Sequence, residues 1–116
     1  MEDDTLFVKS MNFAVRIVNL YKYLCKEKCE TTMSKQLFRS GTSIGANVRE
    51  AKYGQSHADF TSKMSIALKE ASESEYWLEL LWKTQFLSDE QYKSIMNDCG
   101  EIARVLTAIV KSSKKK

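Results

Sequence analysis

Two glycines one helical turn apart, Gly41 and Gly45, constrain this chain more than any other feature of its sequence. They lie within residues 34–53, where an apolar seam recurs at helical spacing and predicts an α-helix. The seam consists of Leu37, Ile44, Val48 and Ala51. A glycine inside a helix costs about 1 kcal/mol relative to alanine. We therefore expect the two glycines to let the backbone of a neighbouring helix approach closely, because that contact would offset the cost.

Polar residues border this seam at spacings of three and four. They are Ser40, Ser43, Asn47 and Glu50. Polar groups that are buried beside a seam must be hydrogen-bonded, so we expect a structural polar network to the next helix or to a neighbouring subunit. Its expected members are Ser43, Asn47 and Glu50, with Glu73 and Glu75 of the next helix. Buried networks of this kind can fix helix register and oligomeric state.

Three more helices are predicted from apolar periodicity, over about residues 5–27, 57–85 and 88–111. The first has a seam of Phe7, Met11, Ala14, Val18, Tyr21 and Cys25, and a second row of Phe13, Ile17, Leu20 and Leu24. The seam over 57–85 is Phe60, Met64, Ala67, Ala71, Ser74, Leu78 and Leu81. The last seam is Tyr92, Ile95, Cys99, Ile102, Leu106 and Ile109.

The helix ends are marked by capping signals. Ser56 and Ser88 each begin a capping box, in which a serine is followed three residues later by a residue with a carboxylate or an amide side chain. Thr32 or Ser34 is the expected N-cap of the second helix. Gly54 is expected to adopt a left-handed conformation where that helix ends.

The composition favours helices with short connections, because the 116 residues include no proline and only four glycines. A chain of this length is enough for one domain with a core. We predict an all-α fold, an up-down-up-down antiparallel four-helix bundle over residues 1–111. A flexible basic tail is expected over residues 112–116, and both chain ends should lie at the same end of the bundle.

The apolar arcs of the first and third helices are wider than one bundle core can bury. In the third helix, the seam is broadened by Ile66, Leu68, Trp77, Leu80 and Trp82. A large apolar surface on a small soluble protein marks an interaction site. We therefore expect a stable homo-oligomer.

The positive charge is concentrated at the C-terminus. The formal net charge is +3, and four of the 18 basic residues are Lys111, Lys114, Lys115 and Lys116. Without them, the 15 acidic residues outnumber the basic ones by one. Lysine tails are often only solvated, but these lysines are also candidate contacts to the phosphates of RNA or DNA.

A second, ordered basic site is predicted on the outer side of the second helix. It consists of Arg39, Arg49 and Lys52, with Tyr53 available to stack on a base. Binding at either basic site would be non-specific in sequence and would weaken as the salt concentration rises.

The sequence contains no recognisable catalytic, cofactor-binding or metal-binding constellation. His57 is the only histidine, and helical spacing places no serine or cysteine nucleophile near it. Cys25 and Cys29 are four residues apart, which suits two metal ligands, but free cysteines more often pack as small apolar residues. We expect no cofactor, no metal and no enzyme activity.

The chain also lacks the features of a membrane or secreted protein. It has no apolar run of the roughly 18 residues that cross a membrane. Its acidic start, residues 1–4, has no signal-peptide profile. We expect a cytoplasmic protein without a membrane partner.

Several blocks of sequence carry a resemblance to a known family. They are SGTSIGANVREA at residues 40–51, Phe60, SIAL at residues 65–68 and ESE at residues 73–75. In order and spacing they resemble the small proteins encoded by intervening sequences in bacterial 23S ribosomal RNA genes. That family has a relative in the accessory protein of diversity-generating retroelements. Many members have proline where this chain has Gly45, and glycine where it has Ala51.

The resemblance implies a four-helix bundle that forms a homopentamer, has no catalytic role, and associates with nucleic acid or with a nucleic-acid-processing protein. The near-neutral body of the chain favours an alternative, a protein-binding adaptor without nucleic-acid contact. Salt-dependent binding to RNA or DNA would separate these two classes. An enzyme, the third class, is disfavoured by the lack of a catalytic constellation.

Overall fold

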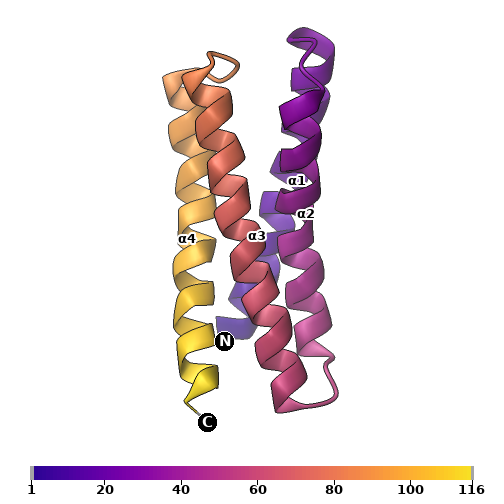
Figure 1. The fold of residues 1–116 in the computed structure, drawn as a ribbon, viewed down its shortest axis with the longest axis vertical. Coiled ribbons are helices and arrows are strands. Elements are labelled where there is room, and N and C mark those ends of the chain that lie inside the picture. Colours follow the sequence, from indigo (N-terminus) through magenta and orange to yellow (C-terminus); the bar gives the residue numbers. More distant parts are fainter. Residues whose placement is uncertain (1, 116) are drawn as a thin grey trace.

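Four α-helices joined by short connections form an antiparallel bundle (Figure 1). The computed structural model describes residues 2–115, with side chains from Thr5 to Lys115. The helices are α1 (Glu2–Glu27), α2 (Thr32–Lys52), α3 (His57–Lys83) and α4 (Asp89–Lys114). They alternate in direction along the long axis of a body that measures 46 × 21 × 21 Å. The predicted fold class is confirmed.

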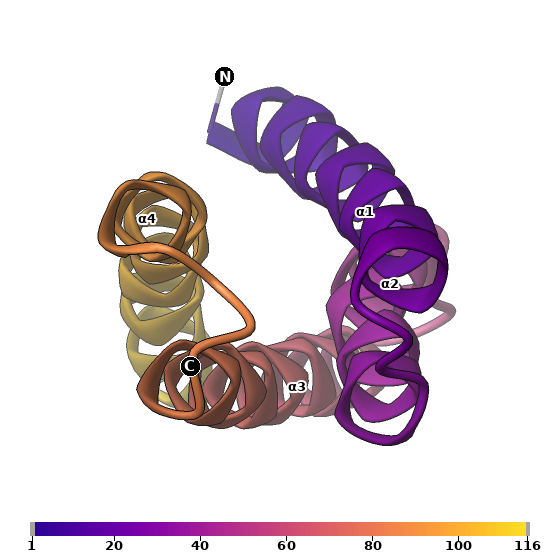
Figure 2. The same cartoon turned by 90° about the horizontal axis from the view of Figure 1, so that it is seen from above.

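The helices follow one another round the bundle in the order α1, α2, α3 and α4, as seen from above in Figure 2. The α1–α4 contact is the least extensive between neighbours. Lys9 Nζ lies 2.9 Å from Glu101 Oε1, and Arg16 Nη1 lies 2.7 Å from Asp98 Oδ2. Ion pairs therefore bridge the side of the bundle where neighbouring helices have the least contact. Among the described helices, none has the length and apolar character needed to cross a membrane.

The predicted seams of α2, α3 and α4 form the core almost position for position. The buried seam residues are Leu37, Ile44, Val48 and Ala51 in α2, Met64, Ala67, Ala71, Ser74, Leu78 and Leu81 in α3, and Ile95, Cys99, Ile102 and Leu106 in α4. At the end of α4, Val110 is buried and Ile109 is only half-buried. Neighbouring positions point about 100° apart round a helix. A rotation of the last turns of α4 therefore decides which of these two residues faces the core.

The core row of α1 differs from the predicted principal seam. The buried residues of α1 are Leu6, Ser10, Phe13, Ile17 and Leu24. The predicted seam is half-buried or exposed, and Met11 is 48% exposed. Three apolar rows lie side by side on this helix, and spacing alone cannot select the row that faces the bundle axis. The structure therefore corrects the expected orientation of α1 by about one residue.

α2 approaches α1 closely at the two glycines. A Cβ atom at Gly41 would lie 2.8 Å from the Cγ1 atom of the buried Ile17. At Gly45, a Cβ atom would lie 3.4 Å from the Ser10 carbonyl oxygen, an ordinary contact. Both glycines face α1, but only Gly41 lies where an added methyl group would overlap its neighbour.

Both predicted serine caps begin their helices. The Ser56 hydroxyl accepts a hydrogen bond of 3.0 Å from the Asp59 amide at the start of α3. At the start of α4, the Ser88 hydroxyl accepts from the Gln91 amide at 3.1 Å, while the Gln91 side chain accepts from the Ser88 amide at 2.8 Å. Reciprocal bonds of this kind satisfy two amides that have no partner within the helix.

The start of α2 is capped by a residue other than the two expected from the sequence. The Glu30 carboxylate accepts hydrogen bonds from the backbone amides of Thr32, Met33 and Ser34, at 3.1, 3.0 and 2.8 Å. Thr31 is the N-cap residue, and its side chain makes no capping bond. The expected caps, Thr32 and Ser34, are instead amide donors to Glu30. Burial alone would raise the pKa of Glu30, but the hydrogen bonds from these amides outweigh it and lower the pKa.

Two other boundaries differ from the expectation. Gly54 has no left-handed conformation, whereas Cys29 and Gln85, in the turns before α2 and α4, do. α4 continues to Lys114, three residues beyond its expected end, so most of the predicted flexible tail is helical.

The last turn of α4 is fastened to the first turn of α3. The Ser113 side chain is buried and bonds to Thr61. His57 Nε2 donates to the Ser113 carbonyl oxygen at 2.8 Å. These contacts explain why the chain stays helical where lysine-rich composition alone favours fraying.

Gly41→Ala and Gly45→Ala are expected to change stability in opposite directions. At Gly41, overpacking costs about 1–3 kcal/mol, which exceeds the gain of about 1 kcal/mol in helix propensity. At Gly45, the propensity gain should dominate. Urea unfolding with an unchanged denaturant slope would measure both. The close-packing argument fails when the Gly41 variant proves as stable as the Gly45 variant.

Glu30→Ala is expected to lower the free energy of unfolding by about 1 kcal/mol at pH 7, the typical loss of a helix cap. The folded-state pKa of Glu30 lies below its unfolded value. Its stabilisation is therefore present above the unfolded pKa of about 4.3 and is lost as the pH falls through the folded pKa. Thr31→Ala serves as the control and should change stability little. A wild-type-to-variant difference that persists at pH 2 would contradict this account.

Candidate functional site

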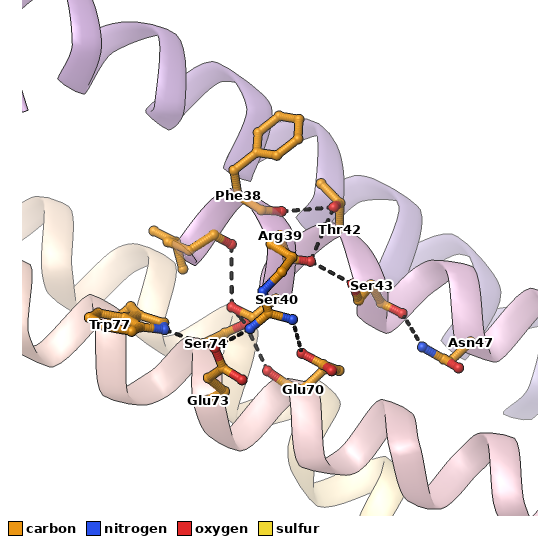
Figure 3. Close-up of polar contacts among 11 residues, drawn as sticks. Phe38, Arg39, Ser40, Thr42, Ser43, Asn47, Glu70, Glu73, Ser74 and Trp77 are labelled. Atoms are coloured by element: carbon orange, nitrogen blue, oxygen red, sulfur yellow. Dashed lines mark hydrogen bonds and ion pairs between the residues drawn. The ribbon is translucent and has the colours of Figure 1, made fainter. Parts of the chain in front are cut away.

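A polar cluster joins α2 to α3 next to the sequence blocks that carry the family resemblance (Figure 3). Arg39 Nη1 on α2 lies 3.3 Å from Glu70 Oε1 on α3, and its other terminal nitrogen pairs with Glu73. The Glu73 carboxylate also accepts a 3.0 Å hydrogen bond from the indole of Trp77. The Trp77 indole lowers the pKa of Glu73, and Arg39 lowers it further.

A pair of serines lies in the core beneath this cluster. The Ser74 hydroxyl on α3 donates to the Ser40 hydroxyl on α2 at 2.9 Å, and both residues are fully buried. Ser40 in turn donates to the Leu37 carbonyl at 3.4 Å. The small side chains let α2 and α3 pack closely, and the hydrogen bonds satisfy the buried hydroxyls.

The residues of the expected polar network are not all brought together. The Ser43 hydroxyl donates to the Arg39 carbonyl at 2.6 Å, and the Asn47 amide donates to the Ser43 carbonyl at 2.9 Å, so both bonds stay within α2. Glu50 reaches α3 through Lys63 at 2.9 Å. Of the two expected α3 residues, only Glu73 joins the cluster.

Glu75 lies on the α4 side of α3. Burial raises the pKa of Glu75, and Arg104 on α4 partly offsets that effect. The α2–α3 contact instead contains Arg39, Glu70 and Trp77, of which Arg39 and Trp77 were not expected there. The spacing of these residues along each helix does not show which of them meet. That would have required the register of α2 against α3, which the sequence does not give.

The predicted basic site on α2 is divided by these contacts. Arg39 is held by two carboxylates, so its charge is largely neutralised. The Arg49 guanidinium carbon lies 5.4 Å, and Lys52 Nζ 4.5 Å, from the centre of the Phe7 ring. Tyr53 is 72% exposed. Arg49, Lys52 and Tyr53 therefore remain together as a basic and aromatic surface at the end of α2.

The basic residues of the C-terminus lie on the last turn of α4. Lys111, Lys114 and Lys115 are exposed. Lys116 lies outside the described residues. Because α2 and α4 run in the same direction, both finish at one end of the bundle (Figure 1). The two predicted nucleic-acid contacts are thus parts of one basic end, which comprises Arg49, Lys52, Tyr53, Lys111, Lys114 and Lys115.

The two side chains best suited to catalysis, Cys99 and His57, take part in contacts within the bundle. Burial, together with the nearby charges of Glu75 and Asp98, raises the pKa of the Cys99 thiol to about 12, so the thiolate nucleophile is scarce at neutral pH. His57 is bonded to the backbone of α4. Among the side chains that the structure describes, from Thr5 to Lys115, no cluster of three or more histidine, cysteine or acidic residues is placed to hold a metal ion.

The structure thus defines a small all-helical bundle in which several polar residues connect neighbouring helices, and in which the last turns of α2 and α4 carry exposed cations at one end. Comparison with known families assigns it more closely: residues 2–108 match the 23S rRNA-intervening sequence proteins, and the chain belongs to that family. A search of curated proteins finds no match.

One solved structure is similar over nearly the whole chain. It is the crystal structure of a protein of unknown function from the S23 ribosomal protein family of Bacteroides thetaiotaomicron. The two sequences are 59% identical, the match covers 96% of this chain and 99% of the other, and the TM-score is 0.94. The expected family is confirmed.

Trp77→Phe is expected to raise the pKa of Glu73 towards its ordinary value, because the phenyl ring fills similar space but donates no hydrogen bond. The carboxyl carbon of Glu73, followed by NMR as the pH is changed, would report the shift. Trp82→Phe is the matched control, since the Trp82 indole bonds to Asp89 at 2.8 Å. Equal Glu73 titrations in wild type and Trp77→Phe would refute the assigned cause.

Proposed function

We propose that the protein is a non-catalytic, cytoplasmic homo-oligomeric scaffold that associates with nucleic acid or with a nucleic-acid-processing enzyme. The observation that carries this proposal is the family match over residues 2–108, because the family's name refers to intervening sequences of 23S ribosomal RNA. The solved relative is likewise described as a member of a ribosomal protein family. A pentamer is the assembly implied by the sequence resemblance.

The basic end supports a contact with phosphates. Lys111, Lys114 and Lys115 are exposed at the end of the bundle where α2, with its cations, also finishes. A single copy offers few such charges, but an oligomer with its basic ends together raises the effective concentration of cations for one nucleic-acid strand. Binding by this route depends on counterion release and is independent of sequence. Tyr53, at 72% exposure, adds a surface on which a base can stack.

A protein-binding adaptor without nucleic-acid contact is the second candidate function. It is favoured by the ion pairs of Arg39, which remove one cation from the predicted basic site. Exposed apolar side chains on α1, among them Val8 and Val15, also suit a protein partner better than a phosphate backbone.

Binding of RNA and DNA at about 50 mM salt, where charge contacts are strong, would test the proposal. Deleting Lys114, Lys115 and Lys116 is expected to make the slope of log affinity against log salt shallower, because fewer counterions are released. On duplex DNA, the change should be up to about 0.9 for each phosphate that the shortened chain no longer neutralises. Arg49→Ala with Lys52→Ala should have a smaller effect of the same kind.

Lys93→Ala, an exposed change near the opposite end of α4, is the control and should leave the slope unchanged. Wild-type protein that retains neither nucleic acid at this salt concentration would refute the nucleic-acid contact and favour the adaptor.

A further inference from the structure

We propose that the last turn of α4 is an ordered face that binds the phosphate backbone of one nucleic-acid strand, and that a junction with α3 holds this face in its binding conformation. The lysine face consists of Lys111, Lys114 and Lys115. The junction consists of His57, Thr61 and Ser113. The inference rests on the nucleic-acid contact of the proposed function. It adds that the lysines bind as part of a helix, and that residues outside the face determine its affinity.

The three lysines are exposed on one side of the last turn of α4. Successive residues of an α-helix are rotated by about 100°, so positions 111, 114 and 115 fall within an arc of about 100°. Ser113 is buried and lies on the opposite side of the helix. From Arg104 onward the chain has no acidic residue, so this end of α4 brings no carboxylate of its own to the lysine face.

The junction connects the buried side of this turn to the first turn of α3. The Ser113 hydroxyl bonds to the Thr61 hydroxyl, and His57 Nε2 donates to the Ser113 carbonyl oxygen at 2.8 Å. Ser113 follows Leu106 and Val110 among the buried residues of α4. Loss of its partners on α3 would remove the bonds that hold the turn in place, and a buried hydroxyl without a partner favours fraying.

The spacing of the lysines suits neighbouring phosphates of one strand. Lys111 and Lys115 are separated by a rise of about 6 Å along the helix. Successive phosphates of one DNA strand are about 3.4 Å apart along the duplex axis, so the lysine face spans about two steps of the backbone. An ordered face can contact these phosphates directly, whereas a loose tail would lose conformational entropy on binding.

The ordered face predicts that loss of order and loss of charge affect binding differently. When only the ordered turn binds, the apparent dissociation constant is the intrinsic constant divided by the ordered fraction. Fraying of the turn should therefore weaken binding even though every lysine is retained. The number of counterions released should not change, because the bound complex has the same phosphate contacts.

Binding of a single-stranded oligothymidylate at several salt concentrations would test the proposal with Thr61→Val combined with His57→Ala. The NMR chemical shifts of the Cα atoms of residues 111–115 would measure the ordered fraction. We expect this junction variant to fray the last turn and to bind about tenfold more weakly. The slope of its log affinity against log salt should equal that of the wild type.

Two further variants separate the junction from a general effect of substitution. Thr61→Val combined with His57→Gln should recover part of the affinity, because the glutamine amide can still donate to the Ser113 carbonyl. Ser112→Ala, a change at an exposed neighbouring position, is the matched control and should bind like the wild type.

Lys111→Gln with Lys114→Gln is the contrasting change in charge. Its last turn should stay helical, and its salt slope should become shallower by up to about 0.7 for each phosphate that is no longer neutralised on a single strand. A shallower slope in the junction variant would overturn the positioning role, because it would mean that phosphate contacts had been lost.

The remaining outcomes distinguish this inference from the proposed function. A junction variant that is frayed but binds as tightly as the wild type would overturn the ordered face and leave the nucleic-acid contact standing, made by loose lysines. A last turn that stays ordered in the junction variant would overturn the role of the junction. A wild type that binds neither oligothymidylate nor RNA at about 50 mM salt would overturn both proposals.

Discussion

The close contact between α1 and α2 at Gly41 is the constraint on which the rest of the bundle depends. Ile17 fills the space that a side chain at Gly41 would need, and this contact fixes the distance between α1 and α2 and their register. On its other side, α2 meets α3 through the serine pair Ser40 and Ser74. α2 can contact both neighbours closely because its interior positions are small. The absence of a side chain at Gly45 leaves a groove on the outer side of α1 and α2. The two glycines of α2 therefore affect both the core and the surface of the bundle.

Polar contacts between α2 and α3 complement this packing by selecting one alignment of the two helices. Arg39 contacts Glu70 and Glu73, which are separated by about one helical turn, so a shift of α3 by one turn would leave at most one of the two carboxylates within reach. Individually, exposed ion pairs contribute little to stability. Their consequence here is specificity, because a misaligned bundle would leave at least one of these carboxylates without its Arg39 contact. It also follows that charge counted along the sequence overstates the charge that α2 offers to a nucleic acid.

Much of the fold could be predicted from the sequence because the signals are local. Capping by Ser56 and Ser88, the seams of three helices and the two glycines depend on spacings within one helix. The row of α1 that faces the core could not be predicted, since Leu6 and Met11 have similar apolar character and only the neighbouring helices decide between them. The capping role of Glu30 was missed because its carboxylate reaches forward from outside the helix. The ordered end of α4 depends on Ser113 meeting Thr61, a contact between residues that are far apart in the sequence.

The candidate site was harder to predict than the fold, because surface function depends on which polar groups the bundle uses for itself. Arg39 and Arg49 look equivalent in the sequence, yet one is held by carboxylates and the other lies over an aromatic ring. The surface of the proposed scaffold thus offers apolar residues on α1 and cations at the basic end, and these two should respond differently to salt. Burying the exposed apolar residues of α1, such as Val8 and Val15, in an oligomer relies on the hydrophobic effect, which strongly hydrated salts such as sulfate strengthen. Contact between the basic end and phosphates relies on counterion release, which any added salt weakens. Assembly through apolar residues of α1 and nucleic-acid binding at the basic end should therefore respond in opposite directions to sulfate, because the first depends on apolar burial and the second on charge.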